Sequence, residues 1–130
     1  MKKLFAEQAD TLKVMTYATD IRPITSPIPL SQALEGVQGL DWSLCPDTEL
    51  TVSGVSVSSI DIEDNWLFVA IPGLVQHGIR FLHAAVEAGA TAVVTDPEGS
   101  ERAREMNPDI PIVIVADPRR ASATIAANIY

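Results

Sequence analysis

His77 and His83 are the side chains in this sequence best suited to bind a metal or to move a proton. Their spacing does not match the i, i+3 or i, i+4 pairing of two ligands on one helix, and no cysteine stands near them. For His83 the pattern favours a solvated helix face, paired with Glu87. His77 lies in a loop before that helix, where ligand contact and loop structure are equally favoured.

Three serines, Ser56, Ser58 and Ser59, suggest a nucleophile, but no G-x-S-x-G elbow surrounds them and no base can be assigned. Ser56 and Ser58 alternate with valines and are expected on the exposed side of a strand. Ser59 follows at the strand end, where its hydroxyl is better placed to donate a hydrogen bond to a ligand.

Asp61, Glu63 and Asp64 form an acidic cluster that could attract a hard cation. Neither the spacing of a calcium-binding EF-hand loop nor its glycine is present, so a solvated turn is favoured and no metal site is expected. Cys45 is the only cysteine, and a buried structural thiol is favoured for it. The sequence therefore offers no catalytic residue.

Two common nucleotide-binding motifs are absent. The sequence has no Gly-Lys pair, which excludes a P-loop, and no G-x-G-x-x-G. A net charge of -8 also argues against nucleic acid as a partner, since the few basic residues are not gathered in one motif. An anionic small molecule remains compatible, because backbone N–H groups at a helix start can bind one.

The bulk composition is that of an ordinary globular domain. A length of 130 residues fits one domain, with 47% hydrophobic and 20% charged residues. No apolar run approaches the roughly 20 residues of a membrane span, and the start, MKKLFAEQAD, does not resemble a signal peptide. A single cysteine excludes an intrachain disulfide. We expect a cytoplasmic protein without a membrane partner.

The elements that must position these side chains alternate between strands and helices from Leu50 onward. Period-two alternation predicts one strand over 50–59, and continuous apolar runs predict three more. Helices are predicted between and after these runs. The first has Phe81, Leu82, Ala85 and Val86 on its apolar stripe and is ended by Gly89. The last is opened by Asp117 as N-cap and Pro118 as the first helical residue. The later strands are Leu67–Ile71, Ala92–Val94 and Ile112–Val115, and the helices are Ile79–Ala88, Glu98–Met106 and a segment from Pro118 to Tyr130. This order predicts an α/β fold with a small, mostly parallel sheet flanked by helices.

Residues 1–49 are more loosely patterned and form a lead-in to this core within one domain, 1–130. Short helices are expected near Leu4–Leu12 and Leu30–Leu34, the second ended by Gly36. The prolines at 23, 27 and 29 exclude a long helix or a central strand. Gly39, Trp42 and Pro46 suggest a covering loop.

Several motifs together carry a family resemblance. They are GVSVSS at 54–59, LFVAIPG at 67–73, His77-Gly78, FLHAAVEAGATAVVTD at 81–96, Asp117-Pro118-Arg119-Arg120-Ala121 and the closing AANIY. In this order and spacing, over about Leu50–Tyr130, they resemble the N-terminal, UDP-binding domain of the Mur ligases. The Asp-Pro-Arg helix ending in a tyrosine favours the MurE branch, the UDP-N-acetylmuramoyl-tripeptide synthetases, over the MurF branch.

The resemblance implies a binding role for the loops after the first two core strands. It implies that Val57 and Ser59 line the uracil and diphosphate of a UDP-N-acetylmuramoyl-peptide, and that Leu74, Val75, Gln76 and His77 close over the nucleotide. Family members commonly carry Asp-Ser-Arg where this chain has Ser58-Ser59-Ile60, and Pro-Gly-Asp where it has Asp64-Asn65-Trp66. The serine is kept, and the arginine contact is lost.

The resemblance further implies an ATP- and magnesium-dependent enzyme that adds a diamino acid to UDP-N-acetylmuramoyl-L-Ala-D-Glu for peptidoglycan. In the family, ATP and magnesium bind in a central domain and the amino acid in a C-terminal one, and neither matches residues 1–130. These residues are expected to need those partner domains, to hold no cofactor and to be inactive alone. A MurF-type or other Mur-like amide ligase, and a stand-alone module for protein contact, are the alternatives.

Overall fold

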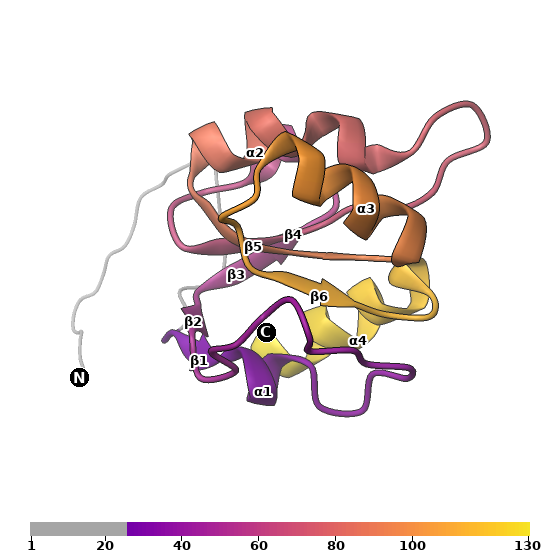
Figure 1. Cartoon of the computed structure of the whole chain (residues 1–130). Coiled ribbons are helices and arrows are strands. Elements are labelled where there is room, and N and C mark those ends of the chain that lie inside the picture. The colour runs from indigo at the N-terminus through magenta and orange to yellow at the C-terminus, as the bar shows by residue number, and fades with distance from the viewer. Residues whose placement is uncertain (1–25) are drawn as a thin grey trace.

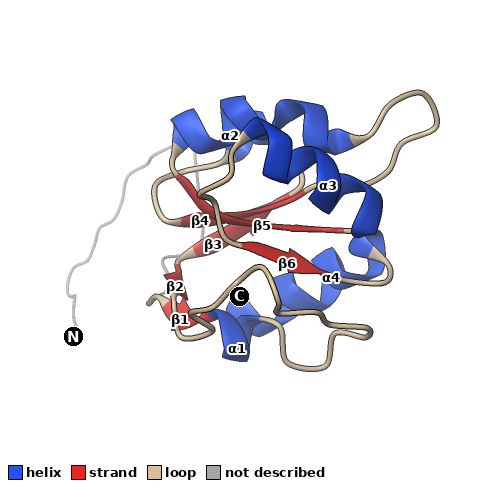
Figure 2. Cartoon of the chain, in the orientation of Figure 1, coloured by secondary structure: helices blue, strands red, loops and turns tan. Residues whose placement is uncertain are grey.

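The computed structural model describes residues 26–130, and its centre is a four-stranded, wholly parallel sheet (Figures 1 and 2). The strands follow one another in space as in the sequence, in the order β3-β4-β5-β6. They are β3 Gly54–Ser56, β4 Trp66–Val69, β5 Ala90–Thr95 and β6 Ile112–Ile114. The predicted α/β class and parallel sheet are confirmed. The helix predicted near Leu4–Leu12 lies outside the described residues.

Helices cover both faces of the sheet. The crossovers β4–β5 and β5–β6 step in the same direction, and because such connections are right-handed their helices share one face. These are α2 (Leu82–Ala88), preceded by the short 3-10 helix η3 (Gly78–Phe81), and α3 (Pro97–Met106). The opposite face is covered by α1 (Leu30–Ala33) and α4 (Pro118–Ile129), as Figure 1 shows.

Each strand of the sheet contributes to two cores because successive side chains point to opposite faces. In β4, Leu67 and Val69 pack toward α1 and α4, whereas Phe68 and the following Ala70 pack toward α2 and α3. All four side chains are buried. This double coverage explains why the segment is a continuous apolar run rather than an alternating one.

The predicted helix ends are confirmed by their capping geometry. Asp117 Oδ1 accepts a hydrogen bond from Arg120 N at 3.3 Å, and Pro118 is the first residue of α4. Gly89 ends α2 with a φ of 119°, in the left-handed region that favours glycine. Phe81 is a correction: predicted on the buried stripe, it is 47% exposed, because it belongs to η3, whose tighter winding changes the direction of its side chain.

The prediction of a single strand over 50–59 is wrong. Residues 51–56 form two strands, with β2 (Thr51–Val52) pairing antiparallel with β1 (Ile28–Pro29) and β3 pairing parallel with β4. The break lies at Ser53, whose N–H donates to Asn65 O at 2.9 Å. A Cβ at Gly54 would lie 2.3 Å from the Trp66 ring, so this close strand approach requires glycine. Alternation of polarity cannot show such a change of partner.

The loop predicted to cover the core pairs with the outer edge of β6. Asp41 and Ile114 exchange two backbone hydrogen bonds, of 2.8 and 3.1 Å, and Ile112 N donates to Leu44 O at 3.1 Å. The residues before this loop also enter the core, where Leu30 and Leu34 are buried, and Cys45 within the loop is buried as well. Among the described residues, no helix combines the length and the apolar character needed to cross a bilayer.

Candidate functional site

The carboxyl ends of β3 and β4 bring the predicted ligand-binding segments to one edge of the sheet. These strands are parallel neighbours, so the residues that follow them emerge side by side. Val57 and Ser59 follow β3, and Leu74, Val75 and Gln76 follow β4. The two segments start close together at this edge, because adjacent strands lie only about 5 Å apart.

The β3 side of this edge offers hydroxyl groups and an apolar side chain. Val57 is 51% exposed. Ser56 Oγ accepts from Ser58 N at 3.0 Å, and Ser58 Oγ accepts from Ile60 N at 3.3 Å, so both hydroxyls shape the turn. Ser59 Oγ makes no hydrogen bond to another described residue and is free to meet a ligand.

The β4 side is a narrow loop whose tip carries two exposed apolar side chains. Pro72 and His77 form an antiparallel bridge, with Gly73 N donating to Gln76 O at 3.1 Å. Leu74 and Val75, at the tip, have relative exposures of 107% and 93%. The loop projects from the body of the molecule (Figure 1). Large apolar side chains held out in this way are typical of a surface that receives a partner or ligand.

The His77 side chain fixes the base of this loop to the body of the domain. Its side chain is 3% exposed, and Nδ1 accepts from Ile79 N at 3.0 Å, capping η3. Nε2 must then carry the proton, and it donates to Asp96 Oδ1 at 2.8 Å. Of the two readings left open for His77, the geometry favours loop structure, since both ring nitrogens are bonded within the chain.

The anchor is completed by tight packing where β5 meets α3. Asp96 Oδ1 also accepts from Gly99 N at 2.8 Å, capping α3, and Thr95 Oγ1 donates to Ala70 O at 3.1 Å. A Cβ at Gly99 would lie 2.1 Å from Thr95 Oγ1 and 2.8 Å from His77 Cε1. The loop after β4 is thereby fixed to the start of α3.

A hollow of about 300 Å³ lies between this loop and α3. It is lined by Pro72, Gly73, Val75, Gln76, His77, Glu98 and Arg102. Glu98 and Arg102 belong to α3 and were not among the candidate site residues that the sequence indicated. The available signal was their i, i+4 spacing at the start of the helix that follows the neighbouring strand.

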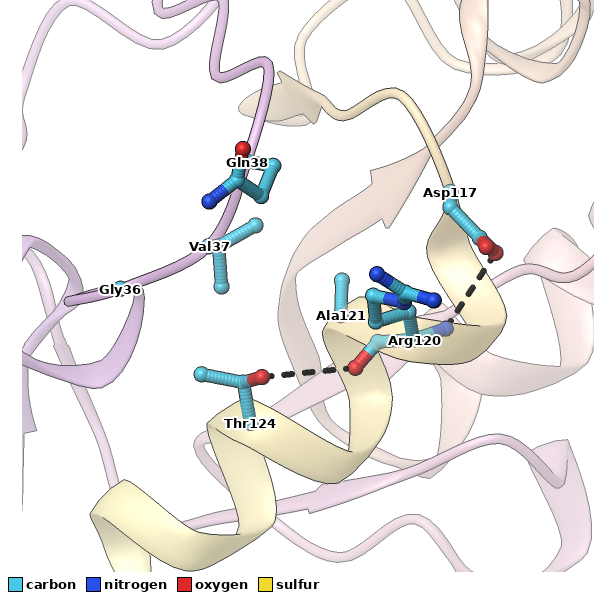
Figure 3. Close-up of a pocket in the computed structure, with 7 residues that line it drawn as sticks. All are labelled: Gly36, Val37, Gln38, Asp117, Arg120, Ala121 and Thr124. Carbon is cyan, nitrogen blue, oxygen red and sulfur yellow. Dashed lines mark hydrogen bonds between the residues drawn. The ribbon is translucent and has the colours of Figure 1, made fainter.

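Two other hollows lie away from the loop that follows β4. A larger open depression of about 550 Å³ is lined by Glu101, Arg104, Glu105 and Pro108 on another side of α3. Between the 36–38 turn and α4 is a cavity of about 30 Å³, room for about one water molecule (Figure 3). Its wall includes Arg120, whose backbone bonds to the Asp117 and Thr124 side chains. Neither offers convergent polar groups beside a projecting loop.

The remaining candidates lie elsewhere. Asp61, Glu63, Asp64 and His83 are exposed, and no group of three or more His, Cys, Asp or Glu among residues 26–130 could hold a metal ion. Cys45 is 1% exposed, as predicted, and burial raises the pKa of its thiol. Asp41 has a lowered pKa because the Ser43 N–H donates to its carboxylate at 2.9 Å.

A parallel sheet covered on both faces, with projecting loops and a hollow at its carboxyl edge, is an α/β architecture of the kind in which ligands bind at that edge. The model of the family described as "Mur ligase family, catalytic domain" matches residues 51–130. The chain therefore belongs to the Mur ligase family.

Curated relatives agree with this assignment. The chain is 36% identical over 117 residues to a UDP-N-acetylmuramoyl-L-alanyl-D-glutamate--2,6-diaminopimelate ligase of Streptomyces avermitilis. The match covers 89% of this chain and 22% of that relative. It is 39% identical over 83 residues to UDP-N-acetylmuramyl-tripeptide synthetase 2 of Oceanobacillus iheyensis, a match that covers 62% of this chain and 15% of that relative. The chain thus spans about a fifth of the length of such relatives. Both are ligases of the MurE type, as the resemblance predicted.

Solved structures show the same fold. A crystal structure of MurF from Acinetobacter baumannii superposes with a TM-score of 0.58 at 20% identity, over 82% of this chain and 21% of that one. Similarity at this level of identity shows the fold alone. It does not favour MurF over MurE, since the sequence relatives of 36% and 39% identity are of the MurE type.

Proposed function

We propose that residues 1–130 form the N-terminal, substrate-binding domain of a MurE-type ligase, which holds the uridine nucleotide end of a UDP-N-acetylmuramoyl-peptide. The observation that carries this proposal is the pair of exposed apolar side chains, Leu74 and Val75, in the segment that follows β4, whose parallel neighbour β3 leads to Ser59. An apolar tip can pack on the flat uracil ring, while a hydroxyl and backbone N–H groups meet phosphate oxygens.

The proposal gives His77 a positioning role. Its ring fixes the base of the loop through its hydrogen bonds to Asp96 and Ile79, and Leu74, Val75 and Gln76 remain free to contact the nucleotide. Val57 supplies a second apolar surface across the edge. The loop is held by four backbone or side-chain bonds and needs little ordering on binding, which lowers the entropic cost of closing on a ligand.

The reaction of the whole enzyme lies outside these residues. A Mur ligase of this type would activate the peptide carboxylate with ATP and magnesium for attack by the amine of a diamino acid. Residues 1–130 contain no P-loop, and the described part offers no cluster for a metal. As the family resemblance implies, we propose that those steps belong to the central and C-terminal domains of a full ligase. The cytoplasmic location stays a prediction.

Titration of the 130-residue protein with UMP, followed by NMR, tests the proposal. We expect weak, millimolar binding, because the other domains would complete the pocket, with amide shifts at Ser59 and Leu74–His77. AMP at the same concentrations is the control and should shift these amides less. Absence of shifts at both segments would sink the site assignment and favour a module for protein contact.

A further inference from the structure

Tyr130 reaches from the end of helix α4 to the edge strand of the parallel sheet. β3 is the first strand in the spatial order of that sheet, so it has one strand neighbour, β4. On its other side, Val55 N donates to the Tyr130 hydroxyl oxygen at 3.1 Å, and the same hydroxyl donates to Val55 O at 3.5 Å. A single hydroxyl group therefore bonds both backbone groups of the central residue of β3.

The Tyr130 side chain contributes little to the packing of its own helix. Its relative exposure is 51%, whereas Ile125 and Ile129 of α4 are buried in the core on this face of the sheet. The two isoleucines hold α4 on the sheet by burial of apolar surface. The specific contribution of the tyrosine is thus its pair of hydrogen bonds to β3.

β3 depends on such a contact because it is only three residues long, Gly54–Ser56. Its start is fixed against β4, where a Cβ at Gly54 would lie 2.3 Å from the Trp66 ring. Its end leads directly into the turn that follows, since Ser56 Oγ accepts from Ser58 N at 3.0 Å. A displacement of Val55 is therefore passed to this turn within a few residues.

We propose that Tyr130 is a positioning residue of the ligand site, whose hydroxyl fixes β3 at Val55 and so sets where Val57 and Ser59 meet the ligand. The inference rests on the proposed function and adds to it a residue that does not touch the ligand. The loop after β4 has its own anchor, the His77 ring with its two hydrogen bonds. The two halves of the site are thus held independently, by Tyr130 on the β3 side and by His77 on the β4 side.

Tyr130→Phe tests the proposal in the free 130-residue protein, because it removes the hydroxyl and keeps the ring. The measurement is amide hydrogen exchange followed by NMR. The Ser58 amide, which reports the order of the turn after β3, should exchange about fivefold faster, the scale of one lost hydrogen bond. The Ile79 amide, which is bonded to His77 Nδ1, should exchange as before.

The same variant is then titrated with UMP. We expect the affinity to fall about threefold, because ordering the β3 side on binding now costs free energy. The shift that UMP induces should shrink at the Ser59 amide and persist at the amides of Leu74–His77. This one-sided loss distinguishes positioning from a general loss of stability, which would affect both segments.

Asn128→Ala is the matched control. It removes two hydrogen bonds from the same helix, but they lead to carbonyls at the end of α1 and not to β3. The ratio of the Ser58 and Ile79 exchange rates, and the UMP shifts of both segments, should therefore stay those of the unsubstituted protein.

Three outcomes contradict the inference. If Tyr130→Phe leaves Ser58 exchange unchanged, the hydroxyl does not order β3, although the proposed function stands. If it affects Ser58 and Ile79 equally, or if Asn128→Ala reproduces its effects, Tyr130 only stabilises the domain. If the unsubstituted protein shows no UMP shifts at millimolar concentrations, the proposed function fails and the positioning role with it.

Discussion

Gly99 lies where the first turn of α3 touches both β5 and His77, at the point that fixes the candidate loop. Its backbone N–H is bonded to Asp96, and its missing side chain leaves room for the Thr95 hydroxyl and the His77 ring. The glycine is needed for close packing and not for an unusual backbone angle. One residue without a side chain therefore lets three polar groups share a buried junction.

Gly99→Ala should destabilise the protein by about 3 kcal/mol, because the new methyl overlaps Thr95 Oγ1 and must displace buried neighbours. Urea unfolding monitored by tryptophan fluorescence measures the change. Glu101→Ala, at an exposed position of the same helix, is the control and should stay within about 0.5 kcal/mol of the unsubstituted protein. A Gly99→Ala protein of unchanged stability would show that α3 can move away from His77.

At the scale of elements, helix α4 ties the two ends of the described chain together. Asn128 Nδ2 donates to Ala33 O at 2.8 Å and to Glu35 O at 2.9 Å, satisfying carbonyls at the end of α1. The Tyr130 hydroxyl accepts from Val55 N at 3.1 Å and covers the outer edge of β3. Such contacts position β3, whose carboxyl end leads to Val57 and Ser59.

Asn128→Ala should lower the free energy of unfolding by about 1.5 kcal/mol, since two carbonyls lose a donor that spans from α4 to α1. The comparison is Ser122→Ala, because the Ser122 hydroxyl bonds only to Arg119 O within the same helix. Thermal unfolding of both variants gives the difference. Equal effects would mean that water replaces the Asn128 amide at no cost.

At the scale of the whole molecule, the buried cores and the loop proposed to bind the nucleotide lie in different parts. The two buried cores flank the sheet, whereas Leu74 and Val75 project beyond them and contribute no buried contact. Changes at the loop tip can therefore alter binding without altering the fold. This separation is expected where a rigid scaffold carries functional loops.

The double substitution Leu74→Ser with Val75→Ser should leave the free energy of unfolding within about 0.5 kcal/mol, as both side chains are exposed. It should weaken UMP binding about tenfold, because apolar surface no longer packs on the base. Urea unfolding and NMR titration give the two quantities. A variant that binds UMP normally would remove the loop tip from the nucleotide site.

The sequence by itself determined the alternation of elements and their ends. Continuous apolar runs correctly predicted β4, β5 and β6, since strands buried on both faces have no polar side. Asp117, Pro118 and Gly89 correctly predicted helix ends, because capping depends on local backbone chemistry that a few neighbouring residues fix. The motifs were also sufficient to indicate the Mur ligase family.

Only the tertiary structure decided which segments meet. The division of residues 51–56 between two sheets depends on Asn65 and Trp66, which lie across a turn. The pairing of His77 with Asp96 joins residues from different loops, and Arg102 reaches the hollow only because α3 packs beside the loop after β4. Capping is a local interaction, whereas contacts between distant segments follow from how the whole chain packs.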